Sequence, residues 1–154
     1  MLLPNDYAMS VSEENSVMVV ESGNGSYAQF VTAGHHVMAA DEPERFGGHD
    51  TGPSPYEYLL AALGSCTAMT LRMYADRHGW ALYQVIVKLR HEAARAADNS
   101  GAVDRFLRSI ELSGNLNSEQ RAKLLEIAER CPVSRTLQRP SQIVTELAPA
   151  SAAA

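Results

Sequence analysis

The sequence is poor in cysteine, tryptophan and clustered positive charge. It holds two cysteines and one tryptophan among 154 residues, and its formal net charge is −5. Arg45 is the only lysine or arginine before Arg72. Because the phosphate backbone of nucleic acids is bound by clusters of basic side chains, this pattern excludes nucleic acid as an expected partner.

No hydrophobic run is long enough to cross a membrane. The uncharged apolar segment Tyr58–Leu71 would span roughly 21 Å as a helix, whereas a bilayer core is about 30 Å thick. Residues 1–10 contain no lysine or arginine and no apolar core, so they do not resemble a signal peptide. We therefore expect a cytoplasmic protein with no membrane partner, in which a free thiol is more often reactive than a structural staple.

The motifs of common metal and cofactor sites are missing as well. There is no CxxC, HxxxH or HExxH spacing, no glycine-rich phosphate loop and no nucleophile elbow. His35 and His36 are adjacent, and adjacent residues of a strand point to opposite faces of the sheet. We therefore expect neither a metal nor a cofactor.

The composition that remains is typical of one globular domain with a hydrophobic core. Hydrophobic residues make up 45% of the chain and charged residues 20%, so the chain is neither disordered nor embedded in a membrane. We expect a single domain over residues 16–147, flanked by flexible tails at residues 1–15 and 148–154.

Three short β-rich runs come first, separated by turn residues. They are Ser16–Glu21, Tyr27–Thr32 and His35–Ala40. Asn24-Gly25 and Ala33-Gly34 between them favour tight turns, so the pattern predicts a three-stranded meander.

A helix is predicted after a polar loop at residues 41–54. Ser54 and Glu57 form a capping-box pattern, and Pro55 suits the first helical position. The segment Tyr58–Leu71 is apolar or small on every face, which predicts a helix that is buried all round. Because one small sheet cannot cover every face of a helix, we expect a homodimer.

Strand and helix patterns alternate in the second half of the chain. Strands are predicted at Tyr83–His91, Phe106–Leu112 and Gln142–Leu147, with a loop over Ala93–Val103. The fold class expected from the whole pattern is α+β.

A second helix is predicted to begin after Asn117. Asn117 is a suitable cap, and Gln120 stands three places later. The helix should end at Cys131, because Pro132 follows and disfavours a helical residue before it. Val133–Leu137 could form one more helical turn.

Cys66 and Cys131 are the strongest candidates for chemistry, because each is the only cysteine of its predicted helix. Arg45 could favour a thiolate and orient a peroxide oxygen, or be a solvated loop charge. Glu57 could be a catalytic carboxylate or only the capping partner of Ser54. The alternative for both cysteines is a small, buried and unreactive side chain.

Two segments carry a resemblance to a known family. The stretches GGHDTGPSPYEYLLAALGSCTAMTLRMYA and IELSGNLNSEQRAKLLEIAERCPVSRTL resemble the OsmC/Ohr family of osmotically inducible protein C and organic hydroperoxide resistance protein. The resemblance covers residues 16–147. It implies an intertwined homodimer with antiparallel sheets packed around two central helices. It also implies a cysteine-based peroxidase of the oxidative stress response, which reduces organic hydroperoxides at the expense of a dithiol.

Carried over by position, the resemblance makes Cys66 the peroxidatic cysteine and Cys131 the resolving one. A sulfenic acid on Cys66 would condense with Cys131 to a disulfide, which an external dithiol reduces. The family's catalytic arginine comes from an early strand, where this sequence has none, and Tyr56 rather than Glu57 holds the glutamate position of the better-studied branch. Two alternatives therefore stay open on the same fold, a non-enzymatic module that binds small apolar molecules and a redox sensor.

Overall fold

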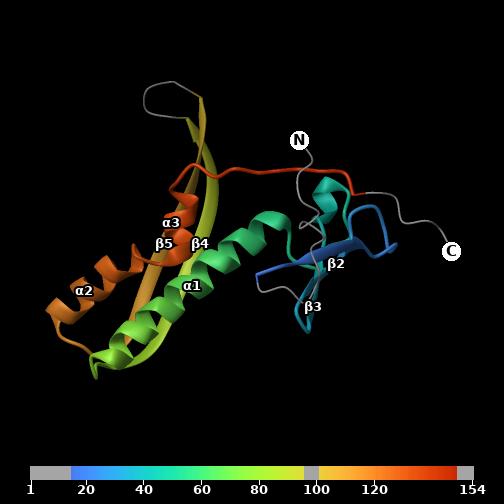
Figure 1. The fold of residues 1–154 in the computed structure, drawn as a ribbon. Coiled ribbons are helices and arrows are strands. Elements are labelled where there is room, and N and C mark those ends of the chain that lie inside the picture. Colours follow the sequence, from blue (N-terminus) through green and yellow to red (C-terminus); the bar gives the residue numbers. More distant parts are fainter. Residues whose placement is uncertain (1–14, 96–100, 149–154) are drawn as a thin grey trace, which may run out of the picture. The chain divides into compact units, whose positions relative to one another are not determined.

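The computed structural model describes residues 15–95 and 101–148, and the chain divides into two compact units (Figure 1). The first unit is residues 1–61 and the second is residues 62–154. Each is described by itself. The two predicted tails lie almost entirely outside the described residues, and the single-domain organisation stays a prediction.

The first unit is built on an antiparallel meander. Its elements are β1 (Met18–Glu21), β2 (Gln29–Ala33), β3 (His36–Ala40), the 3-10 helix η1 (Glu44–Phe46) and the first turns of α1 (Pro55–Arg77). The strands pair in the order β1-β2-β3, which confirms the predicted meander. Gly25 and Gly34 in the turns have φ values of 94° and 59°, which suit glycine best.

The prediction that His35 and His36 point to opposite faces of a strand is wrong. The strand β3 begins at His36, so His35 belongs to the preceding turn, and the two ring centroids lie 4.0 Å apart. Strict alternation holds only inside a strand, and the predicted strand began one residue too early.

One carboxylate organises the polar loop between β3 and α1. Asp41 is 3% exposed and accepts hydrogen bonds from the amides of Glu42 (2.8 Å), His49 (3.1 Å) and Thr51 (3.2 Å) and from the Thr51 hydroxyl (2.8 Å). Gly48 completes the fold of the loop, because a Cβ there would lie 1.8 Å from the carbonyl oxygen of Glu42. The dense ionisable residues of this loop are therefore partly structural.

The second unit combines a β-hairpin with three helices. Its elements are the rest of α1, β4 (Ala81–Arg95), β5 (Ala102–Asn115), α2 (Ser118–Ala128) and α3 (Pro132–Leu137). The strands are antiparallel, and Val85, Val87 and Leu89 are partly buried while Lys88 and Arg90 are exposed, as the alternating pattern predicted. With the meander, this confirms an α+β fold with antiparallel sheets.

The loop predicted over Ala93–Val103 is wrong at both ends. The strand β4 continues to Arg95 and β5 begins at Ala102, because the antiparallel ladder extends through pairs such as Ala94 with Val103. Alanine has a weak β propensity, so the backbone pairing that holds these residues has no local signal in the sequence.

A hydrophobic core fills the space between α1, the hairpin and α2. Its buried members are Leu71, Ala75, Leu82, Leu116, Leu124, Ile127 and Ala128. In Figure 1 the later turns of α1 run beside the β4–β5 ribbon, with α2 and α3 nearby. Arg72 secures the start of the hairpin by donating to the carbonyl of Tyr83 (3.0 Å) and to that of Leu82, at the register shift of β4.

The prediction that the central helix is buried all round is wrong for the single chain. Leu71 and Ala75 are fully buried, whereas Met69 and Met73 are 64% and 62% exposed. One small hairpin covers one face of the helix, and nothing in the described chain covers the face with the methionines. The predicted dimer is not represented in this single chain and stays a prediction.

The capping prediction for α2 is confirmed, but its end is not. The Asn117 side chain accepts from the Gln120 amide (2.8 Å), and the Gln120 side chain accepts from the Asn117 amide (3.0 Å). The helix ends at Ala128, and Cys131 is the N-cap of α3 rather than the last residue of α2. Pro132 therefore starts a helix, where it needs no amide hydrogen, and the predicted turn after it is confirmed.

The strand predicted at Gln142–Leu147 is wrong. Residues 141–148 form neither helix nor strand, and Ile143, Val144 and Leu147 are 92%, 87% and 98% exposed. Branched residues favour an extended backbone, but a strand also needs a neighbour for its hydrogen bonds, and no described strand pairs with this segment. Within the part of the chain that the structure describes, no helix is long and apolar enough to span a bilayer.

Candidate active site

The two cysteines meet inside the second unit. Cys66 lies on the middle turns of α1 and Cys131 at the start of α3, and the two thiols are close enough for each to shift the pKa of the other. Both are free thiols; Cys66 is partly exposed, whereas Cys131 is 0% exposed. The fold therefore brings together the two residues that the sequence singled out.

The environment separates the two thiols in acidity. Burial raises the pKa of the Cys66 thiol, and the hydrogen bond and charge of Cys131 raise it further, against smaller opposing effects of the Val133 amide and the Thr70 hydroxyl. Burial also opposes ionisation of Cys131, but hydrogen bonding from Cys66, Ser134, Thr67 and Val133 outweighs it, so the pKa of Cys131 is lowered. The pair therefore loses its first proton readily and holds its second tightly.

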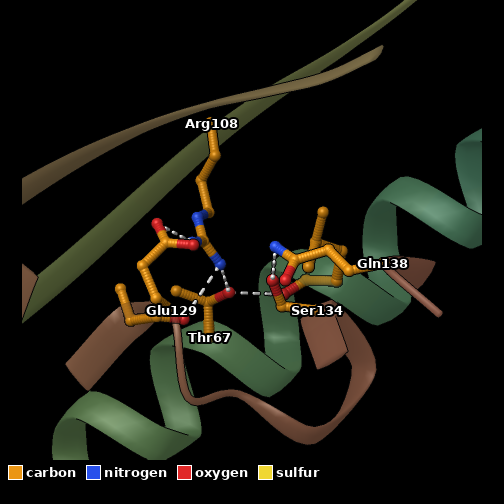
Figure 2. Close-up of polar contacts among 7 residues, drawn as sticks. Thr67, Arg108, Glu129, Ser134 and Gln138 are labelled. Carbon is orange, nitrogen blue, oxygen red and sulfur yellow. Dashed lines mark hydrogen bonds and ion pairs between the residues drawn. The ribbon is translucent and has the colours of Figure 1, made fainter. Parts of the chain in front are cut away.

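The backbone around Cys131 favours a negative sulfur. Cys131 occupies the N-cap of α3, and its side chain makes no capping hydrogen bond. The amides of Val133 and Ser134 nonetheless lie close enough to its sulfur to lower its pKa. Ser134 is itself buried, and its hydroxyl accepts from the Gln138 amide at 3.4 Å (Figure 2).

An arginine of the hairpin contacts Thr67, the residue that follows Cys66 in α1. Arg108 of β5 donates from Nη1 to the Thr67 hydroxyl oxygen (2.9 Å) and the Ala128 carbonyl (3.2 Å), and from Nη2 to Oε1 of Glu129 (2.8 Å). Its side chain is 10% exposed and that of Glu129 is 63% exposed. Figure 2 shows the guanidinium between Thr67 of α1 and the end of α2.

Arg108 was missed in the sequence, although a signal existed. Phe106, Arg108, Ile110 and Leu112 follow one another at a period of two, so the arginine takes an inward position of the strand. A basic residue in a core-facing position needs a partner, and such a position is a candidate for function. In the structure its neighbours are Thr67 and Glu129.

Gly64 allows α1 to approach the strands where Arg108 stands. A Cβ at Gly64 would lie 2.7 Å from Cδ1 of Leu89, and Leu89 pairs with Arg108 in the hairpin ladder. The missing side chain of Gly64 thus brings α1 close enough to the hairpin for Thr67 to contact Arg108.

The other two predicted site residues belong to the first unit. Arg45 lies in η1 with its guanidinium carbon 4.8 Å from the centroid of the Phe46 ring. Glu57 accepts from the amide (2.7 Å) and hydroxyl (2.9 Å) of Ser54, so it makes the capping contact that its spacing predicted. These contacts, and to a smaller extent the Arg45 charge, lower the pKa of Glu57. Catalytic roles for Arg45 and Glu57 stay predictions.

In the described ranges 15–95 and 101–148, no three His, Cys, Asp or Glu side chains are arranged to hold a metal ion. The donors around the thiols are hydroxyls and backbone amides, which favour an anion. Two thiols in such surroundings can form a thiolate and, on oxidation, a disulfide.

The family model of OsmC-like proteins matches residues 48–146, well over half of the chain. The chain belongs to the OsmC-like protein family. The match contains both cysteines, Thr67 and Arg108. No curated protein matches the chain.

Solved structures of OsmC-like proteins share the fold. An OsmC-like protein from Mycoplasma pneumoniae matches with a TM-score of 0.67 at 15% identity, covering 82% of this chain and 88% of that one. An organic hydroperoxide resistance protein OsmC from Legionella pneumophila gives 0.60 at 18%, covering 80% and 89%. The organic hydroperoxide resistance protein OhrB of Bacillus subtilis gives 0.57 at 18%, also covering 80% and 89%.

Proposed function

We propose that this OsmC-like protein is a thiol-dependent peroxidase that reduces organic hydroperoxides. The observation that carries the proposal is the pair of free, neighbouring thiols, of which one is partly exposed and the other buried. Membership of the family supports the reaction class, because relatives of the same fold are named organic hydroperoxide resistance proteins.

Cys66 is the attacking residue in this proposal, because a peroxide can reach a partly exposed sulfur but not one that is 0% exposed. The attacking form is the thiolate. Cys66 becomes a thiolate when its proton passes to the neighbouring, more acidic Cys131. Since nucleophilicity rises with pKa, the minor Cys66 thiolate is the stronger nucleophile of the two.

The reaction balances within the pair and one external dithiol. The Cys66 thiolate attacks the terminal peroxide oxygen, the O–O bond breaks, and the alkoxide leaves as an alcohol with the proton of Cys131. Cys66 is now a sulfenic acid and Cys131 a thiolate. Attack by Cys131 forms the disulfide and releases hydroxide, which becomes water on taking up a proton. A dithiol then reduces the disulfide, as a reducing cytoplasm allows.

We also propose that the protein acts as a homodimer. Ala62, Cys66, Met69 and Met73 follow one another at steps of four, three and four residues, which is the spacing of an interhelical seam. Met69 and Met73 are largely exposed in the single chain. A second copy packed along this seam would cover the methionines and enclose the entrance to Cys66.

The test is consumption of an organic hydroperoxide, such as cumene hydroperoxide, with dithiothreitol as reductant. Cys66→Ser should react no faster than dithiothreitol alone. Cys131→Ser should form a sulfenic acid on Cys66, trapped with dimedone, without forming the intramolecular disulfide. Equal rates for the wild type and Cys66→Ser would reject the proposal, and so would a wild type no faster than the reductant alone.

A further inference from the structure

We propose that Arg108 is a positioning residue that holds the segment of Cys131 against the helical turn of Cys66, so that the two thiols close readily to a disulfide. Arg108 acts through the elements that carry the cysteines, not through contact with either sulfur. The inference deepens the proposed function and rests on it only for its consequence in catalysis. Disulfide closure itself is a property of the chain that any disulfide oxidant can report.

Arg108 joins α1 to the end of α2 through a single nitrogen. Its Nη1 donates to the hydroxyl oxygen of Thr67 at 2.9 Å and to the carbonyl oxygen of Ala128 at 3.2 Å. Thr67 directly follows Cys66 in the sequence, and its own hydroxyl donates to the Leu63 carbonyl at 2.7 Å. The contact of the arginine with α1 therefore lies one residue from Cys66.

The Ala128 carbonyl connects the same nitrogen to the backbone of the second cysteine. It accepts from Nη1 of Arg108 and from the amide of Cys131, the latter at 3.4 Å. The Nη2 atom adds a contact to the carboxylate of Glu129 at 2.8 Å. A chain of hydrogen bonds thus runs from Thr67 through the guanidinium to the amide of Cys131.

These contacts lie largely out of water. The Arg108 side chain is 10% exposed, and Thr67 and Cys131 are 0% exposed. Ser134 of α3 is also buried, and Figure 2 shows its hydroxyl facing that of Thr67. A charged donor makes a strong hydrogen bond, and removing it leaves buried acceptors unsatisfied. The approach of the two cysteine segments therefore depends on buried polar contacts, of which Arg108 makes those to α1 and α2.

Closure to a disulfide needs such positioning, because disulfide geometry is narrow. The Cα atoms of the two cysteines must lie within about 7 Å of each other, with their Cβ atoms turned toward each other. Residues 129–131 lie between α2 and α3, so contacts with neighbouring elements fix the position of Cys131. By holding both segments, Arg108 raises the effective concentration of one thiol at the other.

The first experiment measures this effective concentration by equilibrating the whole protein with reduced and oxidised glutathione. The two thiols give two electrons and two protons to glutathione disulfide, which yields the protein disulfide and two molecules of reduced glutathione. Arg108→Met should lower the effective concentration about tenfold, equivalent to about 1.4 kcal/mol. Arg108→Lys keeps the charge and part of the donor set, so its value should lie between. A wild-type or higher value in a folded Arg108 variant would overturn the proposal.

Two substitutions of Thr67 form a matched pair on the α1 side, and neither changes a charge. Thr67→Val keeps the shape and removes the hydroxyl, so it should lower the effective concentration, whereas Thr67→Ser keeps the hydroxyl and should stay near the wild type. Since Arg108 and Thr67 act through one hydrogen bond, Arg108→Met/Thr67→Val should fall little below Arg108→Met alone. Equal effects of valine and serine, or additive effects in the double variant, would contradict the inference.

Arg121→Met separates positioning from general stability. Arg121 also donates to backbone carbonyls, at 2.8 Å to Leu112 and at 3.2 Å to Gly114, neither of which neighbours a cysteine in the sequence. This variant should lower the free energy of unfolding and leave the glutathione equilibrium unchanged. A decrease in effective concentration as large as that of Arg108→Met would assign Arg108 a merely structural role and overturn the proposal.

No hydroperoxide takes part in these equilibria, so a failure of the peroxidase test and a failure of the positioning are separate outcomes. In the peroxidase reaction, slow closure would prolong the sulfenic acid on Cys66 and leave it open to a second hydroperoxide molecule, which oxidises it to a sulfinic acid. Arg108→Met should therefore be inactivated after fewer turnovers than the wild type. Equal inactivation of the two would overturn the catalytic consequence of the positioning.

Discussion

Two neighbouring thiols with pKa shifts of opposite sign are the central feature at the scale of residues. Cys66 and Cys131 differ in exposure and in the groups around them, and each thiol also shifts the pKa of the other. The Thr67 hydroxyl and the Ser134 amide lower the pKa of Cys131, and the Val133 amide lowers the pKa of both thiols. This asymmetry gives the pair an acidic member and a nucleophilic member.

The contribution of the two thiols to the stability of the reduced protein should be greatest near the ordinary thiol pKa of 9.0. The lowered pKa of Cys131 contributes stability above that value, which is lost as pH falls through its pKa in the folded state. The raised pKa of Cys66 has the opposite effect, so its contribution is lost as pH rises through its own folded-state pKa.

The measurement is the free energy of unfolding of the reduced wild type across pH, minus that of the Cys66→Ala/Cys131→Ala double variant. Subtraction removes the pH dependence of all other groups. If this difference in the free energy of unfolding does not change with pH on either side of the expected maximum, the opposite pKa shifts of Cys66 and Cys131 are contradicted.

Helix caps are the features of individual elements that the sequence predicts best. Asn117→Ala removes the side chain that accepts from the Gln120 amide, and should destabilise the protein by about 1 kcal/mol. Asn117→Asp, which keeps an acceptor oxygen, is the control and should stay near the wild type. Urea denaturation measures both, and an alanine variant as stable as the aspartate variant would argue against the cap.

The loop between β3 and α1 depends on the ionised form of Asp41. Burial raises the pKa of this carboxyl, but hydrogen bonds from Thr51, Glu42 and His49 outweigh it, so the pKa is lowered. Its stabilising contribution is therefore present above the ordinary carboxyl pKa of 3.8 and is lost as pH falls through the folded-state value.

Asp41→Asn should lower stability at neutral pH and remove this part of the acid sensitivity. Asp50→Asn is the matched control, because it removes the same charge from an exposed residue whose φ of 54° asparagine tolerates. Thermal melts at neutral and acidic pH measure both variants. Equal behaviour of the two variants would show that Asp41 does not organise the loop.

The elements that the sequence predicts well are those with local signals. Asn117 with Gln120, and Ser54 with Glu57, show their capping partners three residues apart, and turn residues delimit the meander. The extension of β4 to Arg95 and the absence of a strand at Gln142–Leu147 depend instead on pairing with distant backbone, which leaves no local trace. Arg108 lies between the two cases, because its inward position follows from alternation but its partners on α1 and α2 do not.

At the scale of the whole molecule, the described residues leave one apolar face of α1 without cover. The core of the second unit buries one side of α1 against the hairpin and α2. On the opposite seam of the single chain, Cys66 is partly exposed, and Met69 and Met73 are largely exposed. Exposed apolar residues in register along a helix are typical of an interface.

The proposed dimer makes Met69 its most sensitive position. In a twofold arrangement each substitution appears twice in the same interface, so Met69→Glu would bring two unpaired carboxylates into an apolar seam. Since an unpaired buried charge costs about 3–5 kcal/mol, the dissociation constant should rise by at least roughly a hundredfold.

Leu125→Glu, at a 61% exposed position of α2, is the control for added charge and should leave association unchanged. Sedimentation velocity at micromolar protein should give a dimer for the wild type and the control and a monomer for Met69→Glu. A monomeric wild type, or equal association of all three proteins, would mean that α1 keeps its methionines in water and that Cys66 works without a second copy.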